Sequence, residues 1–224
     1  MTTLNVERLT VHIGPLAVVK DASFSVKSGV VCGLVGPNGA GKTTLMRGLM
    51  GALPVTGSVT FGDFDLTKVA PHRRVFHGIG YMPGDRQLVP ELSVGENIAL
   101  PGWTTRDEAT TERLEEIYTL IPELAVAKDR PCLALSGGQQ KLVALARAIM
   151  GGQRLLLLDE PFEGLAPVLV QRLAEILAKL RGRGASILIS DSYETHLHGL
   201  VDVVRYIERG AVLAADHEAE RHTS

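Results

Sequence analysis

The sequence has few cysteines, no long apolar run and no excess of one charge. Its two cysteines, Cys32 and Cys132, lack the spacing of metal ligands and are too few for a disulfide framework. No run approaches the roughly 18 apolar residues of a membrane span, and the N-terminus lacks a basic segment followed by an apolar stretch. The formal net charge is -2, which gives no overall positive field toward nucleic acid. We expect a cytoplasmic protein without a nucleic-acid partner.

The apolar content of the chain is enough for one substantial core, because 45% of the 224 residues are hydrophobic. Three nearly continuous apolar runs cover Val30 to Val35, Leu155 to Leu158 and Ser186 to Ile189. Such runs are typical of strands covered on both faces. Between the second and third runs, apolar residues recur at helical spacing after Pro167, which suits a first helical position. This β-α-β order predicts a parallel sheet.

Other segments flank this predicted sheet. Leu4 to Ile13 and Ala22 to Val26 alternate apolar and polar residues, as half-buried strands do. From about residue 88 to 150 the patterns are helical, and Thr105 followed by Glu108 could form a capping box. We interpret this stretch as a helical insert.

The C-terminal part predicts a closing hairpin and a tail. Val203 to Ile207 and Ala211 to Ala214 are joined through a glycine-containing turn, and residues 216–224 are polar. We expect one domain over residues 1–215, followed by the polar tail.

A phosphate-binding loop is predicted where the first apolar run leads into a helical pattern. The sequence GPNGAGKTT matches G-x-x-x-x-G-K-[ST]. Its glycines let backbone N–H groups wrap phosphates, Lys42 can reach the β- and γ-phosphates of a nucleotide, and the Thr43 hydroxyl can hold Mg²⁺. The alternative is a glycine-rich turn that binds nothing. The predicted nucleotide-binding residues are Gly36, Pro37, Asn38, Gly39, Ala40, Gly41, Lys42, Thr43 and Thr44.

Two carboxylates follow the apolar run LLLL, where the carboxyl ends of parallel strands bind ligands. Asp159 is expected to hold Mg²⁺ together with Thr43, and Glu160 is expected to polarise an attacking water. The alternative interpretation is that both are surface acids that cap a helix. Glu160 and Lys42 are the predicted catalytic residues. The predicted fold is α/β: a phosphate-loop NTPase (RecA-like) parallel sheet with an N-terminal antiparallel β subdomain and the helical insert.

A second glycine-bearing turn, LSGGQQK, opens another helical pattern. A phosphate loop alone also suits kinases, GTPases and motors, but LSGGQQ together with GPNGAGKTT and LLLLDEP resembles the ATP-binding subunits of ABC transporters, from about residue 3 to 215. That resemblance implies two such subunits packed head to tail, with this turn facing the partner's ATP. Its helix N-terminus suits an anion. The residues concerned are Leu135, Ser136, Gly137, Gly138 and Gln139.

A finer resemblance concerns EPFEGLAPVLV and YMPGDRQLVPELSVGENI, which are similar to stretches of the branched-chain amino acid importer ATPases. It implies an energy subunit of a bacterial amino-acid importer, on the inner face of the membrane. Its expected partners are integral-membrane permeases, an external solute-binding protein and a second ATPase subunit. Lipopolysaccharide-export and sugar-import ATPases share parts of both stretches.

The chain departs from the family at the base-stacking position and in the loop after YMP. The resemblance places Ile13 and Val18 in the nucleotide site, and Ile13 stands where an aromatic residue usually stacks on adenine. Gly84 replaces the Gln or Glu that meets Mg²⁺ and the attacking water. Asp85 and Gln87 lie nearby, but their spacing does not suit a direct replacement.

A third departure lies in the loop after ILISD. Ser192 stands where the family presents His or Gln to the γ-phosphate, and His196 and His198 are expected to be ordinary surface histidines on a following helix. Loss of one positioned polar group costs about 10²–10³ in rate. We therefore expect slow turnover when two copies pair, and a different, more complete ATPase subunit as the physiological partner. The alternative is a partner subunit of weak activity, or the ATPase of a lipid or sugar transporter.

Overall fold

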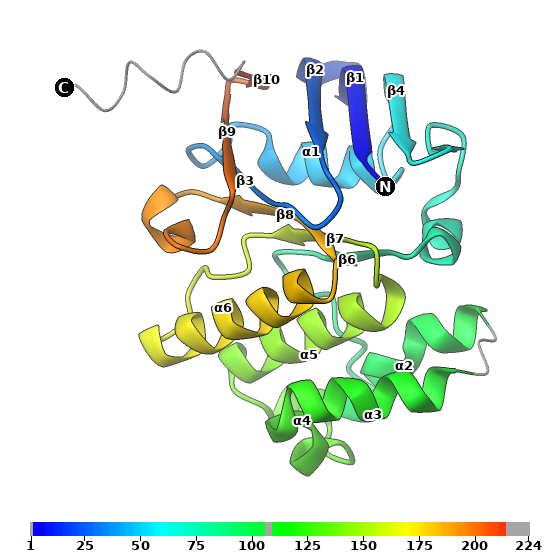
Figure 1. The fold of residues 1–224 in the computed structure, drawn as a ribbon, viewed down its shortest axis with the longest axis vertical. Coiled ribbons are helices and arrows are strands. Elements are labelled where there is room, and N and C mark those ends of the chain that lie inside the picture. The colour runs from blue at the N-terminus through cyan, green and yellow to red at the C-terminus, as the bar shows by residue number, and fades with distance from the viewer. Residues whose placement is uncertain (1, 106–108, 214–224) are drawn as a thin grey trace.

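The computed structural model describes residues 2–105 and 109–213, whose strands form two sheets (Figure 1). A four-stranded antiparallel sheet has the order β2-β1-β4-β5 and a six-stranded sheet has the order β10-β9-β3-β8-β7-β6. The first comprises β1 (Leu4–Ile13), β2 (Leu16–Val26), β4 (Val55–Phe61) and β5 (Phe64–Asp65). The second comprises β3 (Val31–Val35), β6 (Ile79–Met82), β7 (Leu155–Asp159), β8 (Ser186–Asp191), β9 (Val203–Glu208) and β10 (Ala211–Val212).

The central strands of the six-stranded sheet are buried on both faces. Strands β6, β7, β8, β3 and β9 pair in parallel, while β10 returns antiparallel to β9. Alternate residues of β7 enter two different cores: Leu156 and Leu158 pack toward the helices, and Leu155 and Leu157 pack toward the antiparallel sheet. Because successive side chains of a strand point to opposite faces, a run of four leucines suits this position.

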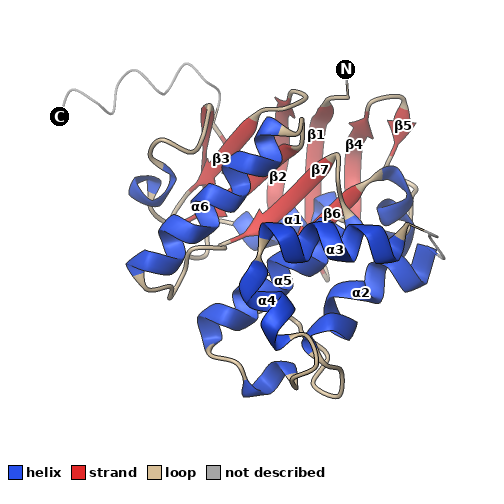
Figure 2. Cartoon of the chain, turned by 60° about the horizontal axis from the view of Figure 1, so that its bottom comes forward, coloured by secondary structure: helices blue, strands red, loops and turns tan. Residues whose placement is uncertain are grey.

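Helices cover both faces of this sheet. Helix α1 (Lys42–Leu49) lies between the two sheets, while α5 (Gly137–Gly151) and α6 (Pro167–Gly182) cover the other face (Figure 1). Helices α2 (Val94–Thr105), α3 (Thr110–Leu120) and α4 (Pro122–Ala127) gather with α5 on one side of the molecule (Figure 2). Short 3₁₀ helices are η1 (Pro71–His77), η2 (Cys132–Ala134) and η3 (Glu194–Leu197).

The predicted fold class is confirmed, with corrections to several boundaries. Strand β2 begins at Leu16, before the predicted Ala22, and β8 continues past Ile189 to Asp191. The β9–β10 hairpin turns at Arg209 and Gly210, whose φ angles are both positive at 48° and 82°. Sequence patterning did not indicate that β9 also pairs with β3, because a short alternating run gives no register.

The predicted capping box at Thr105 is wrong. Thr105 is the last residue of α2, and its hydroxyl donates to the carbonyl of Gly102 at 3.0 Å. Helix α3 starts after Ala109. Glu108, Ala214 and the predicted tail at 216–224 lie outside the described residues.

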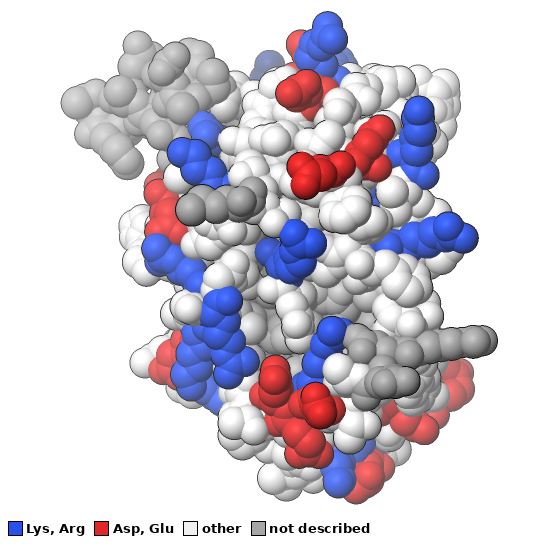
Figure 3. Space-filling model, turned by 45° about the vertical axis from the view of Figure 1, so that its right-hand side comes forward, with Lys and Arg blue, Asp and Glu red and all other residues white. Residues whose placement is uncertain are grey.

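Charged side chains of both signs are interspersed on the face shown in Figure 3. In the ranges 2–105 and 109–213, no helix combines the length and apolar character needed to cross a membrane.

Candidate functional site

The loop between β3 and α1 is held by two close approaches of backbone. A Cβ on Gly36 would lie 2.2 Å from the carbonyl oxygen of Ile207, so only glycine fits there. Gly36 also donates its N–H to the carbonyl of Asp191 at 3.2 Å. Gly41 precedes α1 with a φ of 109°, and no side chain caps the helix. Because the first N–H groups of a helix lack intrahelical acceptors, this end of α1 can bind an anion.

A cavity of about 330 Å³ lies over this helix end. Ile13 is not among the residues that line it, and 51% of its surface is exposed. Gly36 and Pro37 stand beneath the cavity, where their carbonyls accept hydrogen bonds from Lys42, and Ala40 is buried. The lining residues are Val18, Asn38, Gly39, Gly41, Lys42, Thr43, Thr44, Glu160 and Glu163.

Lys42 is buried and its ammonium has four polar neighbours. Its Nζ donates to the carbonyls of Gly36 at 2.7 Å and Pro37 at 3.2 Å, and to the Ser192 hydroxyl at 3.1 Å. It also forms an ion pair with Glu160 Oε1 at 3.0 Å. The two predicted catalytic residues therefore meet at the edge of the cavity.

Ser192 belongs to this site, although we expected its position to have lost a contact. Its hydroxyl donates to Asn38 Oδ1 at 2.7 Å and lies 3.2 Å from Glu160 Oε1. Strand β8 ends at Asp191, so the next residue stands beside the phosphate loop after β3, the neighbouring parallel strand. The loop thus presents a hydroxyl to Lys42.

Asp159 is buried at the end of β7, where desolvation raises the pKa of its carboxyl. The Ser190 hydroxyl donates to its Oδ1 at 2.6 Å, and the nearby Thr43 side chain, like Ser190, opposes the rise of this pKa. A hydroxyl and a carboxylate are oxygen donors of the kind Mg²⁺ takes beside phosphate oxygens. These residues fit a magnesium site made by Thr43 and Asp159.

Gly84 lies directly against this carboxylate. A Cβ at Gly84 would lie 3.3 Å from the Asp159 carbonyl oxygen and 3.8 Å from its Oδ2. Asp85 and Gln87 do not line the cavity; Gln87 Nε2 donates to Asp85 Oδ2 at 3.1 Å. Position 84 therefore places no side chain beside the Asp159 carboxylate.

Glu160 sits in a strained turn. Its φ is 48°, a left-handed value that is uncommon outside glycine, and its N–H donates to the Ser190 carbonyl and hydroxyl, both at 3.1 Å. The carboxylate side chain is 20% exposed and faces Lys42. A water in the cavity could be polarised by this carboxylate.

The LSGGQ turn lies outside this cavity, at the N-terminus of α5. Ser136 caps the helix: its hydroxyl accepts from Gln139 N at 3.3 Å, and Gln139 Oε1 accepts from Ser136 N at 3.0 Å. Ser136, Gly137 and Gln139 are exposed, while Leu135 is buried. The helix end is thus open to a ligand held by another molecule.

The two histidines after β8 differ. His196 lies in η3 and is exposed, as expected of a surface histidine, and its Nδ1 lies 3.0 Å from Oδ1 of the buried Asp191. His198 is exposed, past the end of η3.

Sequence reasoning missed three polar residues near the site: Glu163, Ser190 and Lys141. Glu163 follows the predicted acids along the chain, Ser190 faces them in the fold, and neither belongs to a motif. Lys141 had one usable signal, a cation directly before the apolar run LVALA of a helix. Its Nζ bonds to the carbonyls of Glu160 and Glu163, which only the fold reveals.

Known proteins match the chain over nearly its whole length. The family described as ABC transporter matches residues 19–163. The high-affinity branched-chain amino acid transport ATP-binding protein BraG of Pseudomonas aeruginosa is 30% identical over 95% of this chain and 92% of its own length. The lipopolysaccharide export system ATP-binding protein LptB of Haemophilus influenzae is 34% identical over 96% of this chain and 88% of its own length.

Solved structures agree with this. A nucleotide-free ATP-binding cassette from an ABC transporter superposes with a TM-score of 0.80 at 27% identity, covering 96% of this chain and 90% of the other. An ATP-binding cassette in its ADP conformation gives the same TM-score, identity and coverage.

Proposed function

Because the chain belongs to the ABC transporter family, as one of its ATP-hydrolysing cassettes, we propose that it pairs head to tail with a second cassette and energises an amino-acid importer. In this pair, each ATP lies between the Lys42 site of one cassette and the Leu135–Gln139 turn of the other. The observation that carries the proposal is the meeting of Lys42 and Glu160 at the cavity, with an uncovered helix N-terminus at Ser136 elsewhere on the chain.

The residues of the cavity have separate roles in the proposed hydrolysis of ATP. Lys42 neutralises charge on the β- and γ-phosphates, and its ammonium then binds phosphate oxygens instead of the Glu160 carboxylate. Thr43 and Asp159 hold Mg²⁺, which when bound supplies further positive charge to the phosphate oxygens. Glu160 orients the water that attacks the γ-phosphorus and accepts its proton, and ADP and phosphate leave.

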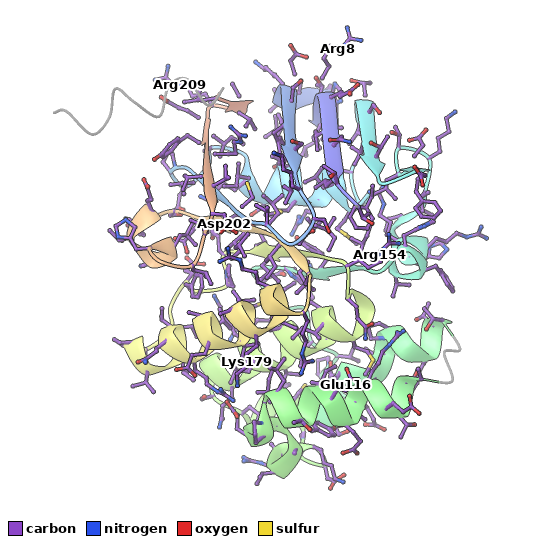
Figure 4. The ribbon with its side chains drawn as sticks, in the orientation of Figure 1. Arg8, Glu116, Arg154, Lys179, Asp202 and Arg209 are labelled. Atoms are coloured by element: carbon purple, nitrogen blue, oxygen red, sulfur yellow. The ribbon has the colours of Figure 1, made fainter. Side chains whose placement is uncertain are left out.

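The test uses Glu160→Gln, which keeps the shape of the side chain but removes the base. With ATP and Mg²⁺, this variant should elute as a dimer in size-exclusion chromatography with light scattering, and turnover should be suppressed. The control is Glu116→Gln on α3 (Figure 4), an exposed residue away from the cavity, which should behave like the wild type. A Glu160→Gln protein that stays monomeric at saturating ATP and Mg²⁺ contradicts a closed pair of two copies of this chain.

For the cargo, we propose an amino acid, because BraG, named as a branched-chain amino acid transport protein, matches over nearly its whole length and EPFEGLAP is similar to the importer pattern. The partners would then be permeases and an external solute-binding protein, with this chain on the inner face of the membrane. The 34% sequence identity to LptB, which is named as a lipopolysaccharide export protein, makes lipopolysaccharide export the second candidate. Stimulation of ATP turnover in the purified transporter by a binding protein loaded with leucine supports import, and the absence of any response to it favours export.

We further propose that the permease docks in a groove of about 400 Å³ between η1, α2 and α5. Its walls include Pro71, Val75, Leu100, Pro101 and Gly151. Leu100→Glu places a charge in this groove and should abolish co-purification with the permease while ATP affinity is kept. Val126→Glu, at a residue of α4 that is 89% exposed, is the control and should leave co-purification unchanged.

The second cassette is proposed to be a different chain. Gly84 supplies no side chain to the site and Ser192 supplies only a hydroxyl, whereas the Leu135–Gln139 turn has the family pattern. In the purified native transporter, Ser136→Arg should therefore abolish most turnover, and Glu160→Gln should cost much less. Equal losses from both changes would favour two identical cassettes.

A further inference from the structure

Helix α5 carries a buried lysine that the proposed reaction does not use. Lys141 is 6% exposed, and its ammonium donates to the carbonyls of Glu160 at 2.8 Å and Glu163 at 2.6 Å. Desolvation lowers the pKa of this ammonium, and the nearby Glu163 carboxylate opposes the shift. Burying an ammonium costs free energy unless its hydrogen bonds are satisfied. Moving either carbonyl would leave the ammonium without one of its acceptors, so Lys141 holds both carbonyls in place.

The segment that Lys141 holds is the strained turn of Glu160. On its N-terminal side, the turn is fixed to β8 by the bonds from Glu160 N to Ser190. Inside the turn, Glu163 N donates to the Glu160 carbonyl at 3.3 Å, the same oxygen that accepts from Lys141. A left-handed conformation at a residue with a side chain persists only where surrounding contacts hold it. Lys141 is one of those contacts.

Ser136 lies at the N-terminal end of the helix that carries Lys141. The capping serine and Lys141 are five residues apart on one rigid helix, so displacement of the cap moves the ammonium. A second polar connection joins α5 to the loop that contains Gly84. Arg147 donates to the carbonyls of Arg86 at 2.7 Å and Gln87 at 2.8 Å, and Arg86 donates to the Gly137 carbonyl at 3.3 Å.

We propose that Lys141 is a positioning residue that couples the two ATP sites of the head-to-tail pair. It transmits the seating of the α5 N-terminus on the partner's nucleotide to the carboxylate of Glu160 over this chain's own nucleotide. This inference rests on the proposed function, because it needs Ser136 to face a second cassette.

The test measures ATP affinity, turnover and cooperativity for self-paired copies of three variants. Lys141→Met keeps the length of the side chain and removes the ammonium, and Lys141→Arg restores a cation with N–H donors. Lys179→Met is the matched control, because Lys179 is exposed on α6 (Figure 4).

A coupling role predicts a separation of affinity from rate. Lys141→Met should bind ATP within about twofold of the wild type by calorimetry, lose about tenfold or more in kcat, and show a Hill coefficient reduced to about 1. Lys141→Arg should regain most of kcat and cooperativity, and Lys179→Met should match the wild type. An unchanged kcat and Hill coefficient in Lys141→Met, or a wild-type Hill coefficient of about 1, overturns the proposal. So does a parallel loss of ATP affinity and melting temperature, which indicates a structural role alone.

Ser136→Arg, measured alongside, separates this inference from the proposed function. If Ser136→Arg abolishes turnover and Lys141→Met leaves it unchanged, only the coupling is rejected. If Ser136→Arg itself has no effect, the shared site and the coupling both fail.

Discussion

The ammonium of Lys42 lies 3.1 Å from the hydroxyl of Ser192. The serine follows β8 and the lysine begins α1, so residues 150 positions apart meet because β3 and β8 pair in parallel. The loop after β8 thus keeps a polar group against the phosphate-binding lysine, with a hydroxyl in place of the larger side chain that the family presents.

Ser192→Ala should lower kcat without preventing ATP binding. The change removes one charge-assisted hydrogen bond from the Lys42 ammonium, worth about 1.5 kcal/mol, or about tenfold in rate. Steady-state ATPase assays measure it, with Ser28→Ala in an exposed turn as the control. A rate equal to that of the wild type would show that the hydroxyl contributes nothing.

Lys42→Ala should weaken ATP binding about 10- to 100-fold, because a charge-assisted bond to phosphate contributes about 1.5–3 kcal/mol. The variant also leaves the Glu160 carboxylate without its cation, which adds repulsion toward the triphosphate. Isothermal titration calorimetry with ATP and Mg²⁺ checks this. Unchanged affinity would reject the phosphate-loop assignment.

Gly84→Gln combined with Ser192→His should raise turnover of the self-paired chain. A side chain at position 84 would begin 3.8 Å from Asp159 Oδ2, and the resemblance to the family implies that an amide at this position would meet Mg²⁺ and the attacking water. Since each positioned polar group contributes about 10²–10³ in rate in other enzymes, a gain of about tenfold or more is expected. If the double variant, folded and with unchanged ATP affinity, is no faster than the wild type, these two positions do not limit turnover.

Asp159→Asn should stabilise the nucleotide-free protein and remove its response to Mg²⁺. The pKa of Asp159 is raised in the folded state, so keeping the carboxylate ionised costs stability above the ordinary pKa of aspartate, and this cost disappears as the pH falls below it. At pH 7 the relief of this cost should raise the melting temperature. The gain should shrink as the pH falls toward 4.

Differential scanning fluorimetry with and without Mg²⁺ and ATP measures both effects. Ser190→Ala is the comparison variant, because it removes a hydrogen bond to the same carboxylate but keeps the charge. Equal stabilisation of Asp159→Asn and the wild type by Mg²⁺ and ATP would contradict the assignment of the metal ligand.

Much of the fold could be predicted because its signals are local. Runs such as Leu155 to Leu158 predict strands buried on both faces, and Pro167 begins α6 as expected. The start of β2 and the pairing of β9 with β3 could not be predicted, since they depend on register between distant segments. The phosphate loop and the acids after β7 were found because their spacing is fixed along the chain.

The remaining contacts of the site come from side chains that meet only in the fold. Ser192 lies beside Lys42, and His196 turns back to Asp191, because of how the loop after β8 folds. Lys141 binds two backbone carbonyls, which every residue type carries, so the residue types alone do not reveal its partners.

The shared ATP site is tested most directly by mixing two inactive variants of the chain. Each copy carries both a Lys42 site and a Ser136 turn, so a head-to-tail pair of two copies would contain both halves of each shared site. Lys42→Ala removes the binding lysine, and Ser136→Arg blocks the turn, so either variant alone should be nearly inactive. In an equal mixture, half of the pairs hold one complete site, so turnover should rise above the sum of the two separate variants, to about one quarter of the wild-type rate for independent sites and to less for coupled ones. Turnover no greater than the sum of the two variants measured separately would contradict a site shared between two chains.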